Sequence, residues 1–258
     1  MKSNYRYIVK AFMAMAVIAG TTSCDDFLDR EPMSSISPET YYSTAAQLEA
    51  NLNDEYPNVL PSFGQWTYGI FGEDKGTDNQ IEVNANDRYT QDRWKVPHSE
   101  SDNWKFERIY RINFFLSEAL PKFGEDMSGS QNTISGSVAT IKHYIGEMYF
   151  LRAYEYFKKL QLFGDFPIIN QPLADEMEAL REASKRFPRN EVARFIISDL
   201  DKAYAYMSDV DMATTRINKD VAMLVKSRVA LFEATWLQNF KGTAFVPGGE
   251  GWPGASLH

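Results

Sequence analysis

The sequence predicts an all-α fold in which antiparallel helices pair as irregular, tetratricopeptide-like repeats joined by long, aromatic-rich loops. Three stretches carry apolar residues at helical spacing: 146–169, 190–207 and the segment from Asn218 to just before Gly242. Within them, small residues recur beside aromatic ones, a pattern that lets one helix approach another closely while rings fill the gaps. A fixed period of about 34 residues is not visible, so we expect divergent repeats.

The stretch 146–169 (GEMYFLRAYEYFKKLQLFGDFPII) gives the strongest helical signal. We expect this helix to begin near Val138 and to end at Gly164, which can adopt the left-handed cap conformation, before Pro167, which forbids continuation. Its apolar residues cover more than one face, so several neighbours must surround it. The stripe consists of Gly146, Phe150, Ala153, Phe157 and Leu160, widened by Tyr149, Tyr156 and Phe163.

Caps and periodicity predict the other helices. Ser37 as N-cap and Pro38 at the first helical position predict a helix over 39–53. Another helix is expected over 102–120, with Pro121 near its end. The segment 170–188 lacks a clean apolar face, and Asn218 is expected to cap the last helix. The stripes of the last two long helices are Val192, Ile196, Leu200, Ala203 and Met207, and Ala222, Val225, Val229, Phe232 and Trp236.

The region 56–101 shows no sustained helical period and is predicted to be a long loop rich in aromatic residues. A stretch of this length inside a compact domain is usually either functional or disordered. Its Trp66, Tyr68, Phe71, Tyr89 and Trp94 argue against disorder. The Gly- and Ser-rich segment 123–137 is predicted to be a surface loop.

The charge balance argues against nucleic acid as the main partner. The chain carries 27 basic and 35 acidic side chains, a net charge of −8. All three charges before residue 24 are basic, so residues 24–258 carry 24 basic and 35 acidic side chains, a net charge of −11. A surface of this sign repels phosphate backbones.

The N-terminus has the form of a secretory signal over residues 1–23. Lys2, Arg6 and Lys10 precede the apolar run 11–20, which is too short to span a bilayer as a stable anchor, and small residues follow. The only cysteine, Cys24, comes directly afterwards. A lone cysteine has no disulfide partner in an oxidising compartment, so we expect lipid attachment at Cys24 and a tether over 24–37. The alternative is an ordinary signal peptide with an incidental cysteine.

The last segment, 242–258, is dominated by glycine and proline and contains several aromatic residues. No helix or cap closes it. We therefore expect a chain truncated inside a larger protein, with the helical domain over 38–241 and the start of a missing second half over 242–258. A natural flexible C-terminus is the alternative.

Five pieces in order resemble the SusD/RagB family of outer-membrane nutrient-binding lipoproteins. They are 23–32 (SCDDFLDREP), 104–116 (WKFERIYRINFFL), 146–169, 188–204 (PRNEVARFIISDLDKAY) and 215–234 (TRINKDVAMLVKSRVALFEA). The resemblance implies the N-terminal part of a longer protein, acylated at Cys24 and facing the cell exterior from the outer membrane, where Asp25 and Asp26 resemble an export tag. It also implies capture of an oligosaccharide, or in some members a peptide, and delivery to a SusC-like TonB-dependent transporter.

A sugar binder needs exposed aromatic platforms beside Asn, Asp, Arg and Gln side chains, because sugars present apolar C–H faces and rings of hydroxyls. The region 73–103 supplies this mixture. We predict Trp94 as the stacking platform, Tyr89 as a second aromatic wall, and Arg88 and Asp78 as hydroxyl-binding groups. Each could instead pin or fill the loop. Trp66 and Trp104 are expected in the core.

The sequence gives little support for a catalytic function. Glu73, Asp74 and Asp78 are too close in sequence to favour a glycosidase pair over solvated or capping carboxylates. No GxSxG, Walker or GxGxxG motif occurs, and the three histidines are far apart, so we expect no enzyme, no cofactor and no metal site. The alternative to ligand binding is a lipid-anchored helical scaffold that only associates with other proteins.

Overall fold

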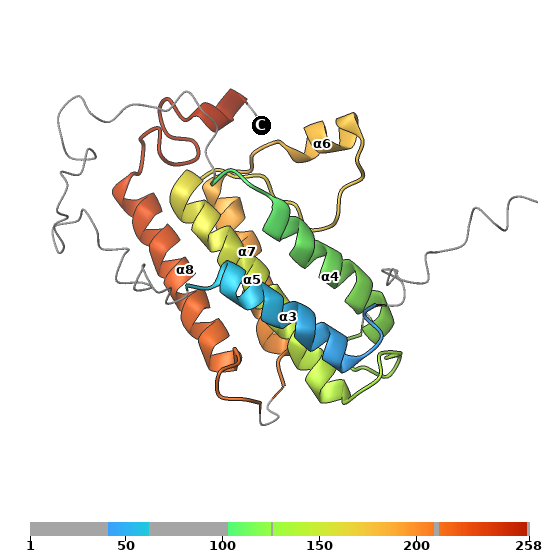
Figure 1. Cartoon of the computed structure of the whole chain (residues 1–258). Coiled ribbons are helices and arrows are strands. Elements are labelled where there is room, and N and C mark those ends of the chain that lie inside the picture. The colour runs from blue at the N-terminus through green and yellow to red at the C-terminus, as the bar shows by residue number, and fades with distance from the viewer. Residues whose placement is uncertain (1–40, 62–102, 125, 209–211, 257–258) are drawn as a thin grey trace, which may run out of the picture. The chain divides into compact units, whose positions relative to one another are not determined.

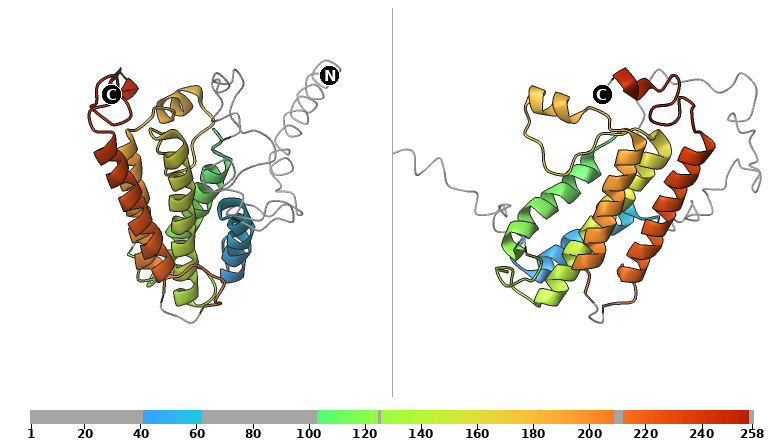
Figure 2. Two further views of the ribbon diagram at one scale, coloured as in Figure 1. Left: turned by 90° about the vertical axis from the view of Figure 1, so that its left-hand side faces the viewer. Right: turned by 180° about the vertical axis from the view of Figure 1, so that it is seen from behind.

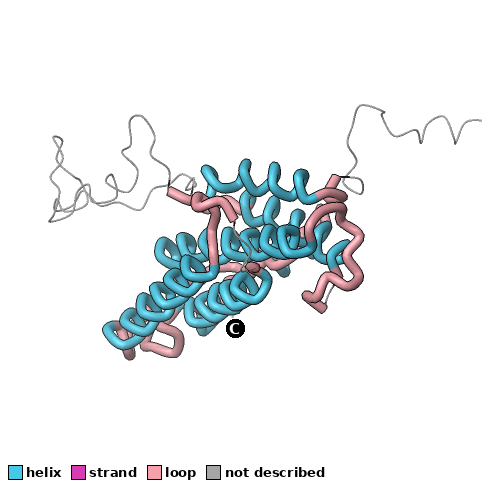
Figure 3. Tube along the Cα trace, turned by 90° about the horizontal axis from the view of Figure 1, so that it is seen from below, coloured by secondary structure: helices cyan, strands magenta, loops and turns pink. Residues whose placement is uncertain are grey.

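One long helix, α5 (Val138–Phe163), forms the axis around which the other helices pack. The computed structural model describes residues 41–61, 103–124, 126–208 and 212–256 (Figure 1). Helix α5 contacts α3 (Ala45–Val59), α4 (Glu107–Phe123) and α7 (Arg189–Tyr206), and α8 (Lys219–Asn239) packs mainly on α7. Every regular element within the described residues is a helix, apart from two isolated bridges (Figure 3). The all-α, tetratricopeptide-like prediction is confirmed.

The predicted limits of α5 are confirmed. The Ser137 side chain accepts a hydrogen bond from the Thr140 amide at the start, and Gly164 ends the helix with a φ of 70°. Of its 26 residues, 17 are buried, so the helix is covered on several sides as its broad apolar pattern requires.

Gly146 explains how closely α5 and α7 approach. A Cβ atom built on Gly146 would lie 2.8 Å from the Met207 backbone nitrogen and 2.9 Å from the Ala203 carbonyl oxygen. These are backbone atoms that no side-chain rotation can move. The small residue on the predicted stripe is therefore a packing requirement.

Helices α7 and α8 start within one residue of the predicted positions. The Asn218 side chain caps α8 by accepting a hydrogen bond from the Val221 amide. Ala222 and Val229 are buried, whereas Phe232 and Trp236 are half-buried, so α8 lies at an edge of the bundle (Figure 2). None of the helices within the described residues is long and apolar enough to cross a membrane.

The predicted bounds of the first helix are wrong. Residues 41–44 form a turn, a bend and a bridge, and α3 begins at Ala45, where Thr44 and Gln47 form a capping box. The pairing of Thr44 with Ser135 is a contact that local sequence cannot reveal. The helix also continues through Pro57 to Val59. The expected cap at Ser37 and Pro38 lies outside the described residues.

Helix α4 begins five residues later than predicted and continues past Pro121 to Phe123. Residues 104–106 are not helical, and the Trp104 and Phe106 rings pack against Phe166 with centroid distances of 4.9 and 5.2 Å. Tertiary packing therefore replaces the first predicted turn. A short helix, α6 (Met177–Ala183), has no buried residue and lies away from the main helices (Figure 1).

A buried polar network ties the segment after α5 to the bundle. The Arg152 guanidinium donates to both carboxylate oxygens of Asp199 at 2.6 and 2.8 Å and to the Asn113 side-chain oxygen at 2.9 Å. It also donates to the Asn170 carbonyl at 3.1 Å, and Asn113 donates to the Ile169 carbonyl at 2.9 Å. The network fixes the chain path beyond Gly164, at the end of α5 where the candidate site lies.

Candidate functional site

The four predicted ligand-binding residues, Asp78, Arg88, Tyr89 and Trp94, lie outside the described residues, as does Cys24. Trp104 is described and is half-buried among aromatic rings, as expected of a packing residue. The site is therefore built from the residues that flank the segment 62–102 and from their surroundings.

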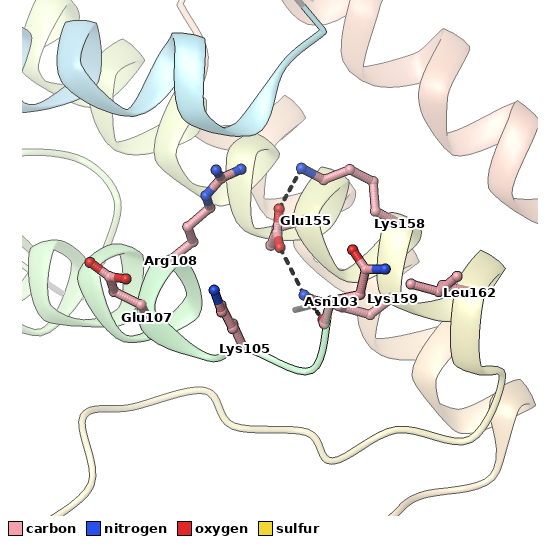
Figure 4. Close-up of a pocket in the computed structure, with 8 residues that line it drawn as sticks. All are labelled: Asn103, Lys105, Glu107, Arg108, Glu155, Lys158, Lys159 and Leu162. Carbon is pink, nitrogen blue, oxygen red and sulfur yellow. Dashed lines mark hydrogen bonds and ion pairs between the residues drawn. The ribbon is translucent and has the colours of Figure 1, made fainter. Parts of the chain in front are cut away.

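The chain is described again from Asn103, which lines a polar cavity of about 350 Å³ between the start of α4 and the last turns of α5 (Figure 4). We call this cavity the basic hollow. The residue pattern did not predict this cavity, because Lys158 and Lys159 lie on the central helix, which we interpreted as packing alone. The residues that line it are Asn103, Lys105, Glu107, Arg108, Glu155, Lys158, Lys159 and Leu162.

Glu155 is buried in this hollow and pairs with two consecutive lysines (Figure 4). Its carboxylate lies 2.6 Å from Lys158 Nζ and 3.4 Å from Lys159 Nζ. Burial lowers the pKa of Lys159, and the charge of Glu155 opposes that effect. The pairing explains how two lysines can sit beside the apolar residues in the last turns of α5.

The same two lysines hold the chain on both sides of the segment 62–102. Lys158 Nζ donates to the Val59 carbonyl at 2.9 Å, and Lys159 Nζ donates to the Asn103 carbonyl at 2.7 Å. Val59 is the last residue of α3, and Asn103 precedes α4. The chain therefore leaves and re-enters the described structure beside one short part of α5.

A second cavity of about 260 Å³ adjoins the first at Leu162, which lines both. We call it the aromatic hollow. Its walls come from the end of α5, the start of α7, the end of α8 and the turns of residues 243–253, which lie at the same end of the bundle as Gly164 (Figure 1). From the sequence we expected Trp236 to lie on a packing stripe, and we assigned no ligand-binding role to the aromatic residues of 242–258. Phe163, Trp236, Phe245 and Trp252 supply its aromatic surface.

The Asp165 carboxylate connects two walls of the aromatic hollow through hydrogen bonds. One carboxylate oxygen accepts a hydrogen bond from Trp252 Nε1 at 2.9 Å, and the other accepts from the Arg189 amide at 2.8 Å. Trp236 Nε1 donates to the Phe245 carbonyl at 3.1 Å. Both indole N–H groups are thus used within the protein, and the rings are fixed in place.

Arg189 is buried between α7 and α8 and supports the wall of the aromatic hollow. Its guanidinium pairs with the Glu233 carboxylate at 2.9 Å and lies 4.0 Å from the centroid of the Trp236 ring. Phe245, by contrast, is 61% exposed. An exposed ring beside polar groups suits contact with an amphipathic ligand.

The described part of the chain offers little support for metal binding. No group of three or more His, Cys, Asp or Glu side chains there could hold a metal ion. The buried His143 is used internally, since its Nε2 lies 3.0 Å from both the Glu147 carboxylate and the Ile217 carbonyl.

The fold and these cavities define an all-α, tetratricopeptide-like protein with two adjoining surface hollows at one end of the bundle. The chain belongs to the SusD-like family, since the family model described as "Starch-binding associating with outer membrane" matches residues 26–231. The resemblance to the SusD/RagB family that the sequence motifs carry is therefore confirmed.

Two relatives come from Formosa agariphila. SusD-like protein P2 is 25% identical over 253 residues, which cover 93% of this chain and 46% of the relative. SusD-like protein P25 is 25% identical over 233 residues, covering 83% of this chain and 41% of the relative. The chain thus spans less than half the length of these relatives.

Solved structures show the same fold. A SusD-like carbohydrate binding protein from Bacteroides vulgatus superposes with a TM-score of 0.50 at 16% identity, over 76% of this chain and 43% of the other. One from Bacteroides fragilis gives a TM-score of 0.50 at 18% identity, over 78% of this chain and 40% of the other.

Proposed function

We propose that the chain is the N-terminal part of a cell-surface lipoprotein that binds a nutrient oligosaccharide and delivers it to a SusC-like TonB-dependent transporter. Membership of the SusD-like family supports this function. Two solved relatives of the same fold bear the description of carbohydrate binding proteins. We propose that the protein binds the oligosaccharide without cleaving it.

The observation that carries the proposal is the attachment of Val59 and Asn103 to consecutive lysines of the basic hollow, which adjoins the aromatic hollow at Leu162. The segment between them contains the proposed ligand-binding residues. The lysines that hold Val59 and Asn103 line the basic hollow, which adjoins at Leu162 an aromatic surface that carries Arg and Asp side chains. That combination recognises sugar faces and hydroxyls. The proposed site residues remain Asp78, Arg88, Tyr89 and Trp94.

We further propose that Cys24 carries the lipid and holds the protein at the outer face of the outer membrane. The signal-like residues 1–23 and the position of the only cysteine support this anchor. Incorporation of a palmitate analogue into the chain, lost on Cys24→Ser, tests the anchor; labelling that persists in the variant would contradict it.

One observation favours a second function, association with another protein alone. Helix α8 presents Leu224 and Leu231 outward, 70% and 66% exposed, with Val221 and Met223 also exposed. Exposed apolar residues on one helix are typical of a surface that a partner covers. Peptide binding in place of glycan binding is the remaining alternative.

Calorimetric titration of the full chain with a panel of oligosaccharides and peptides separates these functions. We expect heat of binding with at least one oligosaccharide, reduced in Trp94→Ala and unchanged in Tyr204→Ala, an exposed aromatic residue on α7. Heat with peptides only would favour the peptide alternative, and no heat with any member would favour the scaffold. Equal affinity in both variants would remove Trp94 from the site.

A further inference from the structure

The basic hollow and the aromatic hollow are neighbours rather than separate sites. Leu162 lines both, is 56% exposed and lies on the last turn of α5. The basic hollow measures about 350 Å³ and the aromatic hollow about 260 Å³, and each is large enough to hold part of a ligand. A chain-like ligand could therefore occupy one hollow, cross Leu162 and enter the other.

The charge of this surface is opposite to the charge of the protein. Six cationic side chains line the two hollows, against three carboxylates. Counting Glu233, which pairs with Arg189 from behind, leaves six against four. The whole chain carries 27 basic and 35 acidic side chains, so a local excess of cations at the cavities is a departure from the average surface. The cations are Lys105, Arg108, Lys158, Lys159, Arg186 and Arg189.

Two of these cations, one in each hollow, are arginines that form no close ion pair with the described residues, although the Glu55 carboxylate interacts with Arg108 electrostatically. Arg108 is exposed on the first turn of α4 and lines the basic hollow. Arg186 is exposed beside α7, lines the aromatic hollow, and lies 4.6 Å from the centroid of the Trp104 ring. That contact orients its guanidinium, and no ion pair with another described residue uses the guanidinium edge. A guanidinium fork matches carboxylate and sulfate groups bidentately.

The other four cations already have partners within the protein. Lys158 and Lys159 are already bound to Glu155 and to backbone carbonyls, Arg189 is bound to Glu233, and Lys105 also has an interaction partner within the chain. These groups build the walls. Arg108 and Arg186 are left to meet a ligand, so the anionic groups of that ligand should lie on both sides of Leu162.

We infer that the ligand of this surface is an acidic oligosaccharide, whose carboxylate or sulfate groups pair with Arg108 and Arg186 while a sugar ring packs on Phe245 and Trp252. This inference deepens the proposed function and rests on it. A neutral glycan would use the aromatic surface but would leave both guanidinium groups without a counter-charge. Carboxylated and sulfated oligosaccharides share one chemical feature, an anionic group on a pyranose ring.

Three probes of equal length test the charge: neutral galacto-oligosaccharides, galacturonate oligosaccharides, which carry carboxylates, and sulfated galacto-oligosaccharides. Each is titrated calorimetrically into the full chain at about 50 and about 300 mM salt, which shortens the screening length by a factor of about 2.5. Arg108→Gln and Arg186→Gln are compared with Arg194→Gln, an exposed arginine on α7 that lines neither hollow.

We expect at least one acidic probe to bind more tightly than the neutral probe and to lose affinity at the higher salt. Each hollow variant should weaken acidic binding by about threefold to tenfold, with neutral binding and the Arg194→Gln control unchanged. The acidic probe that binds identifies the carboxylate or the sulfate as the anion.

Equal affinity for the neutral and acidic probes, or equal loss in all three variants, would overturn the inference while the proposed glycan-binding function stands. Binding of none of the probes, nor of any other oligosaccharide, would overturn both.

Discussion

Lys159 Nζ donates a 2.7 Å hydrogen bond to the Asn103 carbonyl, and its neighbour Lys158 donates one of 2.9 Å to the Val59 carbonyl. These consecutive lysines on α5 hold the chain on either side of the segment 62–102. Closing a long segment costs conformational entropy, and fixed attachment points at both ends offset part of that cost. The lysines thus connect the stability of the bundle with the position of the proposed binding loop.

Replacing Lys159 should loosen this attachment. Lys159→Met removes a buried donor from the Asn103 carbonyl and a partner from Glu155, so we expect the free energy of unfolding to fall by about 1–3 kcal/mol. Urea unfolding measures the change. Lys185→Met, at an exposed ion pair with Glu182, is the matched control and should change it by less than about 1 kcal/mol. Equal effects of the two variants would contradict the attachment role.

The buried pair of Arg152 and Asp199 should be far more sensitive than a surface pair. Arg152→Met leaves the Asp199 carboxylate buried without its bidentate partner, and we expect a loss of about 3–5 kcal/mol in the free energy of unfolding. Lys226→Met, which breaks a more exposed pair with Asp201, is the comparison and should cost under about 1 kcal/mol. A loss below that of the control would show that the network does not hold the exit of α5.

Gly146→Ala should destabilise the protein although alanine is the better helix former. The gain in helix propensity is about 1 kcal/mol, whereas the added methyl group would meet the backbone of Met207 and Ala203 within 3 Å. We expect a net loss of about 1–3 kcal/mol by urea unfolding. Ser227→Ala, at an exposed position of α8, should lie within about 0.5 kcal/mol of wild type. A stabilising Gly146→Ala would mean that α5 and α7 are not in close contact there.

Glu55 provides a prediction about pH. Burial raises the pKa of the Glu55 carboxyl, although Arg111, 2.6 Å away, acts in the opposite direction. A carboxyl with a raised pKa in the folded state contributes stability below its unfolded pKa, about 4.3, and loses that contribution as the pH rises through the folded pKa. Glu55→Gln is always neutral, so it should be more stable than wild type near pH 7, and the difference should vanish near pH 4.

Urea unfolding of both proteins across this pH range measures the effect. A Glu55→Gln variant that is less stable than wild type at neutral pH would show that the Arg111 ion pair outweighs burial. Asp54, which also pairs with Arg111 but is exposed, serves as the control position, because Asp54→Asn removes a surface ion pair and leaves the buried carboxyl in place.

Sequence predicted the parts of the fold that depend on local signals. Gly164 and Asn218 could be assigned as caps, and the stripe through Gly146 and Leu160 identified α5 before any contact was known. The start of α3 could not be predicted, because it depends on the pairing of Thr44 with Ser135, far away in the chain.

The candidate site was less accessible to sequence analysis. The two consecutive lysines, Lys158 and Lys159, were the available signal, but their partners Val59 and Asn103 are set by tertiary structure. Trp252 likewise becomes part of a wall only through its hydrogen bond to Asp165, 87 residues earlier. The predictions for Asp78, Arg88, Tyr89 and Trp94 remain predictions.

We propose that a sugar binds where the aromatic hollow and the basic hollow meet. The most direct measurement is the affinity of the full chain for an oligosaccharide that it binds, compared between wild type, Phe245→Ala and Tyr204→Ala. Both rings are exposed, so neither change should unfold the protein. We predict that Phe245→Ala weakens binding by about 1–3 kcal/mol, as loss of a stacking ring should, while Tyr204→Ala leaves it unchanged. Wild-type affinity in Phe245→Ala would contradict the claim.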